Sequence, residues 1–226
     1  MALPGNAALA MWWDMAPEMR SEFEHWHSHE HFPERLAIPG FRRSSRWTSA
    51  TGGEGIFVMY ELESYEVLSS RGYLASLNAP SPWSTKMMPH HRNMVRCQSR
   101  VLASRGGAVA RQALTVRMSP APGRSEDLRA SLRVLTDSLP QQPGLTGAHL
   151  LQHETPPIAQ TTEQKIRGGD QVGDWVFVAM GYEAAALDAL AQMELSEASL
   201  VAQGAVPGAI SGRYALSYSA IPGDMQ

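Results

Sequence analysis

Cysteine and lysine are scarce in this chain of 226 residues, which contains one cysteine, Cys97, and two lysines. A single cysteine excludes an intrachain disulfide and a zinc site made of several thiolates, and Cys97 is expected to be a buried apolar residue. No apolar run approaches 18 residues, and Asn6 and Asp14 interrupt the N-terminal apolar stretch. We therefore expect neither a membrane span nor a signal peptide.

The charge balance is also unremarkable, with a net charge of -3 and a pI near 6.2. Such a chain lacks the basic surface that nucleic-acid-binding proteins use. Hydrophobic residues make up 43% of the sequence and charged residues 18%, as in ordinary globular proteins. The composition predicts a cytoplasmic protein with no nucleic-acid or membrane partner.

What the sequence does have is a histidine cluster, since four of its eight histidines lie between residues 25 and 31. Imidazole changes charge near neutral pH and is the commonest metal ligand, so the cluster suggests proton transfer or metal binding. A solvent-facing, histidine-rich helix is the alternative. A helix over residues 17–36 would separate the four, because side chains four residues apart share a face.

Helical geometry predicts an inward face and an outward face for this segment. The inward face carries Met19, Phe23, Trp26, His27 and Glu30, with His31 at its edge. The outward face carries His25 and His29, together with Glu22 and Phe32. We therefore expect His27 and His31 to line a pocket, while His25 and His29 are solvated.

The order of predicted elements repeats once along the chain. In the first half, strands are expected at 8–15, 41–49, 56–62 and 96–104, with helices at 17–36 and 64–77. In the second half, strands are expected at 114–118, 145–153, 175–180 and 212–219, with helices at 125–139 and 184–203. Each half reads βαββαβ, which predicts an α+β fold of two tandem ferredoxin-like units forming a pseudo-symmetric barrel within one chain.

We place the boundary between the two units after residue 107. Residues 1–107 carry the histidine-rich helix and the expected pocket, which should lie between the sheet and the helices of this half. Residues 108–226 have no counterpart of the histidine cluster, so we expect them to complete the barrel structurally.

The segment from Trp26 to Arg35, W-H-S-H-E-H-F-P-E-R, is followed by I-P-G-F at residues 38–41. It resembles the W-Y-x-x-E-H-x-P-E-R and I-P-G-F motifs of EthD-like proteins in the dimeric α+β barrel superfamily. The resemblance extends through residues 59–64, 73–74 and 80–83, and covers roughly the first 105 residues. It implies that His31 is the recurrent histidine, surrounded by Glu30, Pro33, Glu34 and Arg35, whereas His27 stands where the pattern more often has Tyr or Asn.

The resemblance also implies a range of activities, because the superfamily includes muconolactone isomerases, polyketide dehydratases and cofactor-independent monooxygenases. We expect a small-molecule enzyme in which His31 and His27 act as general acid and base on a lactone, enone or phenolic compound. Isomerisation or elimination is the leading hypothesis. The alternatives are a metal- or oxygen-dependent monooxygenase on the same barrel, and a non-catalytic ligand-binding stress protein. A homodimer is possible.

A long loop at residues 78–93 is expected to close the pocket or to form a subunit interface. Its candidate substrate-binding residues are Trp83, His90, His91 and Arg92, and those elsewhere are Arg35, Glu30, Trp26 and Tyr60. Phosphate-binding loops and a G-x-S-x-G nucleophile elbow are missing from the sequence. We predict no cofactor; if a divalent metal is bound, His27 and His31 are its expected ligands.

Overall fold

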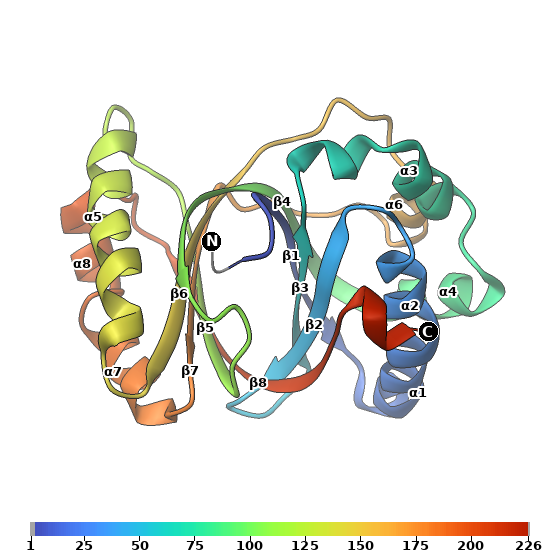
Figure 1. Ribbon diagram of the computed structural model, residues 1–226, viewed down its shortest axis with the longest axis horizontal. Coiled ribbons are helices and arrows are strands. Elements are labelled where there is room, and N and C mark those ends of the chain that lie inside the picture. The colour runs from blue at the N-terminus through green and yellow to red at the C-terminus, as the bar shows by residue number, and fades with distance from the viewer. Residues whose placement is uncertain (1–2, 226) are drawn as a thin grey trace.

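The computed structural model describes residues 3–225, within which eight strands form one closed barrel (Figure 1). The strands are β1 (Ala7–Met15), β2 (Phe41–Ser49), β3 (Gly55–Leu62), β4 (His91–Gly106), β5 (Gln112–Met118), β6 (Leu145–His153), β7 (Trp175–Gly181) and β8 (Ile210–Ala220). Neighbouring strands are antiparallel, in the order β1-β3-β2-β8-β5-β7-β6-β4. All eight predicted strands are present, and β4 is longer at both ends than its pattern indicated.

The strand order confirms the predicted duplication. The first half contributes β4-β1-β3-β2 and the second half contributes β8-β5-β7-β6, so corresponding strands occupy corresponding places. The two sheets join through β2–β8 pairing on one side and β4–β6 pairing on the other. The chain is therefore two ferredoxin-like units closed into one barrel, with the predicted boundary falling between β4 and β5.

Alternation along the strands separates the barrel interior from the layers beneath the helices. In β1, Ala8 and Trp12 belong to the interior cluster, whereas Leu9 and Trp13 belong to the cluster under the first-half helices. This is the period of two expected of a strand that is buried on both faces. The interior also contains Cys97, which is fully buried, as expected of a small apolar residue.

The predicted helix at 17–36 is one continuous helical segment. It runs through η1 (Pro17–Met19), α1 (Arg20–Trp26), a π-helical turn η2 (His27–His31) and α2 (Phe32–Leu36). A π turn contains one residue more than an α turn, so each residue after it occupies the angular position that a uniform α-helix would give to the preceding residue. For this reason the expectation that Phe32 points outward is wrong: its side chain is fully buried, and its ring centroid lies 4.3 Å from that of His27.

Two other predicted helices are interrupted. The segment at 64–77 is divided into η3 (Tyr65–Ser69) and α3 (Arg71–Asn78), because the Ser70 hydroxyl accepts a hydrogen bond from the Tyr73 backbone N–H and begins a new helix. The segment at 184–203 is divided into α7 (Ala184–Gln192) and α8 (Glu197–Gln203), with Ser196 as the corresponding cap. The predicted helix at 125–139 is α5 (Ser125–Ser138), followed by the short turn η5 (Leu139–Gln141).

The predicted loop at 78–93 is mostly helical, and this expectation is corrected. It contains α4 (Pro82–Met87) and η4 (Met88–His90), and Ser81 caps α4 by accepting from the Ser84 backbone N–H. The chain ends in another short turn, η6 (Pro222–Met225). Within the described residues, no helix is long and apolar enough to cross a membrane.

The helices form two separate layers on opposite sides of the barrel (Figure 1). On one side α5, α7 and α8 pack on the second-half sheet around a leucine-rich cluster. On the other side α1, α2, α3 and α4 lie beside the first-half sheet, joined by α6 (Thr162–Ile166) from the β6–β7 connection. A second-half segment thus reaches the first-half layer, which the sequence pattern did not indicate.

Candidate functional site

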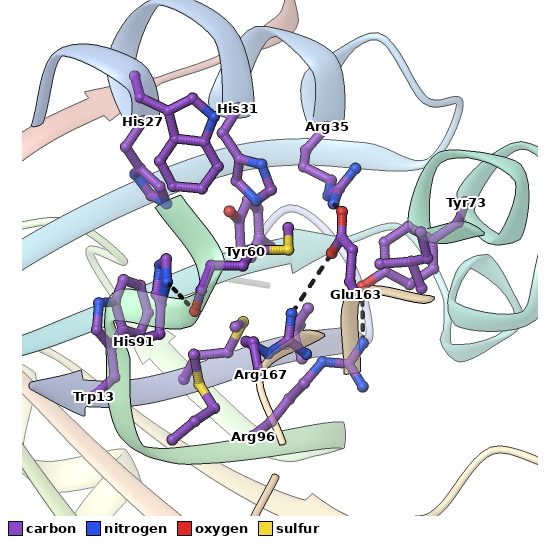
Figure 2. A pocket seen from close by; sticks show the side chains of 16 residues that line it. Trp13, His27, His31, Arg35, Tyr60, Tyr73, His91, Arg96, Glu163 and Arg167 are labelled. Carbon is purple, nitrogen blue, oxygen red and sulfur yellow. Dashed lines mark hydrogen bonds and ion pairs between the residues drawn. The ribbon is translucent and has the colours of Figure 1, made fainter. Parts of the chain in front are cut away.

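A small cavity of about 30 Å³ lies between the outer face of the first-half sheet and its helices (Figure 2). A cavity of this size holds only one or two water molecules. Its walls consist of Leu9, Met11, Trp13, Trp26, His27, His31, Arg35, Tyr60, Tyr73, Leu77, Met88, His91, Met94, Arg96, Glu163 and Arg167. The cavity lies where the pocket was predicted, and His27 and His31 both line it.

His27 comes from the π turn and is almost fully buried. Arg46 Nη1 donates to His27 Nδ1 at 3.4 Å, and a guanidinium cannot accept, so the proton of the neutral ring is on Nε2. Burial lowers the pKa of His27 well below its usual 6.5, and the Arg46 charge lowers it further. At neutral pH His27 is therefore an uncharged hydrogen-bond donor.

His31 lies beside His27, with stacked rings whose centroids are 5.3 Å apart. Burial lowers the pKa of His31 well below its usual value, and Arg35 acts in the same direction. Its Nδ1 is 3.9 Å from Glu34 Oε2 and has no hydrogen-bond partner among residues 3–225. His31 is therefore a neutral imidazole with a ring nitrogen that remains available.

A third imidazole, His91, reaches the cavity from the start of β4. Its Nδ1–H donates to the backbone carbonyls of Met87 and Met88, at 3.2 and 3.1 Å. In the neutral ring the lone pair is then on Nε2, so His91 offers an acceptor. Burial lowers the pKa of His91 to about 3, with Arg167 adding to the effect.

These three pKa values contradict one premise of the sequence-based mechanism. A general acid and base with pKa values near neutrality was expected, whereas burial and neighbouring guanidinium groups keep the three rings uncharged at pH 7. A neutral ring can take up a proton or donate a hydrogen bond, but it holds no extra proton to release at the start of a reaction.

Opposite the histidines, charged side chains from both halves meet. Arg35 Nη2 lies 2.5 Å from Glu163 Oε1, and Arg167 Nη1 lies 3.7 Å from Glu163 Oε2. Burial alone would lower the pKa of Arg35, but the Glu163 carboxylate, together with Tyr73, Glu34 and Tyr60, more than offsets this and raises it. Nearby, Arg96 Nη2 donates to the Tyr73 hydroxyl at 2.8 Å. Figure 2 shows Glu163 between Arg35 and Arg167.

Among the predicted substrate-binding residues, Trp26, Arg35, Tyr60 and His91 line the cavity. The Tyr60 hydroxyl has a raised pKa because it is buried, so it is a neutral donor. Trp26 packs on His31, with ring centroids 4.5 Å apart. Half of the predicted substrate-binding residues therefore line the cavity.

The remaining four predicted residues do not line the cavity. Glu30 faces α4, where its Oε1 accepts from Trp26 Nε1 at 3.1 Å and from the Ser81 hydroxyl. Trp83 lies on the outer side of α1, edge-on to His25 and donating to Glu22 at 3.2 Å. Arg92 is exposed and pairs with Glu54, and His90 ends the short turn η4. The α4 helix accounts for the position of Trp83, because it places this side chain against α1.

Glu163, Arg167, Arg96 and Tyr73 were missed by the sequence analysis. Two of them, Glu163 and Arg167, lie in the long link between β6 and β7, which spans residues 154–174. A local signal was present: Thr161 and Gln164 form a capping box that begins α6. That pattern predicts a helix start but does not indicate what the helix contacts.

A metal site finds limited support in this arrangement. Histidine rings four residues apart can share a metal ion, but a catalytic or structural site needs further ligands. Among the described residues, no group of three or more His, Cys, Asp or Glu side chains is placed to hold one ion. The guanidinium groups of Arg46 and Arg35 lie close to His27 and His31, and their positive charge disfavours a metal cation beside these rings.

No protein-family model and no curated protein matches this sequence, but solved structures resemble it along its whole length. An anthrone oxidase-like protein is 12% identical, covering 100% of this chain and 98% of its own, with a TM-score of 0.69. A candidate monooxygenase from Fusobacterium nucleatum is 6% identical, covering 96% and 95%, with a TM-score of 0.62. Another from Lactobacillus acidophilus is 10% identical, covering 96% and 97%, with a TM-score of 0.61.

At these identities the similarity establishes the fold. The chain has the architecture of the dimeric α+β barrels, with both units in one polypeptide. The finer resemblance to EthD-like proteins stays a prediction.

Proposed function

We propose that this protein is a small-molecule enzyme that removes a proton from a phenolic or enolic compound and lets the resulting anion react with O2. The observation that carries the proposal is the cavity itself: uncharged imidazoles face guanidinium groups across a small space with aromatic and thioether walls. The similar structures, an anthrone oxidase-like protein and two candidate monooxygenases, support an oxidation.

His31 is the proposed proton acceptor, with His91 Nε2 as a neighbouring acceptor. Transfer of a phenolic or enolic proton to a neutral imidazole creates a positive ring next to a negative substrate, and each charge stabilises the other. Arg35 and the Nε2–H of His27 stabilise the developing oxyanion, as preorganised donors do in enzymes. The anion gives electrons to O2: an activated CH2 group and O2 yield a carbonyl group and water.

Isomerisation or elimination of water on the same anion is the second candidate. It needs the same proton removal, and the imidazolium formed in that step then returns the proton at another carbon or to a leaving oxygen. Involvement of Arg35, Trp26 and Tyr60 in substrate binding belongs to both candidates. A small-molecule partner is common to both, and a homodimer remains a prediction.

Oxygen consumption with anthrone as the substrate separates the candidates. The oxidase proposal predicts O2 uptake and formation of anthraquinone in air, no turnover in its absence, and loss of both activities in His31→Ala. The exposed neighbour His29→Ala is the matched control and should retain activity. Anaerobic conversion of a lactone or enone, without O2 uptake in air, would support the isomerase or lyase candidate and contradict the oxidase proposal.

A further inference from the structure

The cavity is too small for an organic substrate, so some part of its wall must move when a ligand binds. About 30 Å³ admits one or two water molecules, whereas ligand sites usually measure several hundred Å³. The question is which wall is held weakly enough to yield.

The first-half sheet and the helix at 17–36 are firm walls. Their apolar side chains pack in a cluster that includes Phe23, Trp26 and Trp13, all nearly or fully buried. Separating them would expose large aromatic surfaces, each contributing roughly 2–3 kcal/mol of burial free energy. These walls are expected to stay in place.

The wall contributed by residues 154–174, here termed the β6–β7 arm, is anchored differently. Within the arm the buried positions are Pro156, Thr161 and Glu163, and the side chains of Arg167 and Asp170, which pair with each other, are also nearly buried. The arm is therefore held by polar contacts rather than by apolar packing. Asn78 Oδ1 accepts from the Thr162 backbone N–H at 3.0 Å, and the backbone of Gln171 pairs with β4 at Met94 and Arg96.

Glu163 is the central contact of the arm with the cavity. Its side chain is 3% exposed and approaches Arg35 of the first half and Arg167 of the arm. A buried ion pair contributes little net stability, because removing two charges from water costs about as much as their attraction returns. A contact of this kind is readily exchanged for an equivalent anion.

We propose that Glu163 occupies the carboxylate-binding subsite of the cavity, and that aromatic carboxylates displace it to bind between Arg35 and Arg167. This rests on the proposed function only in taking the cavity as a small-molecule site. The ligand's carboxylate replaces that of Glu163, so the guanidinium groups keep a partner throughout. Withdrawal of Glu163 with α6 provides space for the aromatic ring beside Trp26 and the histidines.

Binding of benzoate, compared with its neutral isostere benzamide, tests the proposal by calorimetry. Glu163→Gln removes the carboxylate that competes with the ligand for Arg35 and Arg167, so it should bind benzoate about tenfold more tightly than the unmodified protein. Benzamide affinity should be the same in both. Glu34→Gln is the matched control: Glu34 also pairs with Arg35, at 3.2 Å, but does not line the cavity, so benzoate affinity should change less than about threefold.

Hydrogen exchange of the unmodified protein provides a test that does not depend on a variant's folding. Saturating benzoate should increase amide exchange at residues 162–166, because it releases α6, whereas most ligands protect the segments they contact. Slower exchange there with benzoate, or an equal gain in benzamide and benzoate affinity in Glu163→Gln, would overturn the proposal. If the unmodified protein does not oxidise anthrone but benzoate and benzamide bind as expected, the proposed function alone is contradicted.

Discussion

The two helix–sheet layers of the barrel have the same topology but different contents. Beneath α5, α7 and α8, the second layer is filled by apolar side chains such as Leu132, Phe177 and Leu187, all fully buried. Beneath the helix at 17–36, the first layer contains imidazoles, guanidinium groups and a cavity. The difference indicates that duplication allowed one layer to supply stability while the other accommodated polar groups that a lone unit could ill tolerate.

The largest effect is expected from the histidines of the first layer. His31→Ala and His27→Ala should each reduce turnover by about 10²–10⁴-fold, the range for loss of a positioned proton acceptor or of an oxyanion donor. His25→Ala and His29→Ala should be nearly neutral, because both side chains are exposed. Turnover per folded molecule, measured well below the melting temperature, checks this, and equal losses in all four variants would remove the distinction between the faces.

The second layer should respond in stability instead. Leu132→Ala is expected to lower the free energy of unfolding by about 2–5 kcal/mol, as for other buried leucines, without changing turnover per folded molecule. Val134 lies on the exposed side of α5 and is 68% exposed. Val134→Ala should therefore change the free energy of unfolding by less than about 0.5 kcal/mol. Urea unfolding followed by circular dichroism measures both, and a catalytic defect in folded Leu132→Ala would contradict the division between layers.

The buried carboxylate of Glu61, in the barrel wall of the first half, should make the stability of the folded protein depend on pH. Neither oxygen of Glu61 has a hydrogen-bond partner within residues 3–225, and burial raises its pKa to about 7 despite Arg43. A raised carboxyl pKa favours the protonated folded protein, so the stability it contributes is complete below about pH 4.5 and is lost as the pH rises through about 7.

Glu61→Gln should therefore be more stable than the unmodified protein at pH 8, by roughly 3 kcal/mol, and nearly equal to it at pH 4.5. Urea midpoints at the two pH values test this. Glu66→Gln, at a solvent-exposed carboxylate, should show no comparable change between them. A constant difference across the pH range would mean that Glu61 is not the titrating group.

The smallest effect is expected at Trp83. Its indole lies outside the cavity, against His25 and Glu22, so Trp83→Ala should leave benzoate affinity unchanged and lower stability by roughly 1–2 kcal/mol through lost packing. The sequence suggested instead that Trp83 covers the ligand. Calorimetric titration decides between the two, since weakened binding would restore the covering role.

Local patterns in the sequence predicted the strands and the helix at 17–36 because alternation and helical periodicity are properties of neighbouring residues. They also identified His27 and His31 as inward-facing. They could not reveal Glu163, which meets Arg35 across 128 positions of sequence, because no local periodicity records a distant contact. The orientation of Phe32 failed for another reason: the wheel assumed a uniform helix, and the π turn adds one residue to it.

That extra residue is absorbed within the turn that contains it. A π turn contains one residue more than an α turn, so deleting Ser28 would convert it into an ordinary turn and leave α1 and α2 facing as they do now. Phe23 and Trp26 would keep their places, and so would Arg35 beside Glu163. The deletion would instead change the spacing between His27 and His31 inside the turn, so homologous helices with and without the extra residue should be aligned with a gap at this turn.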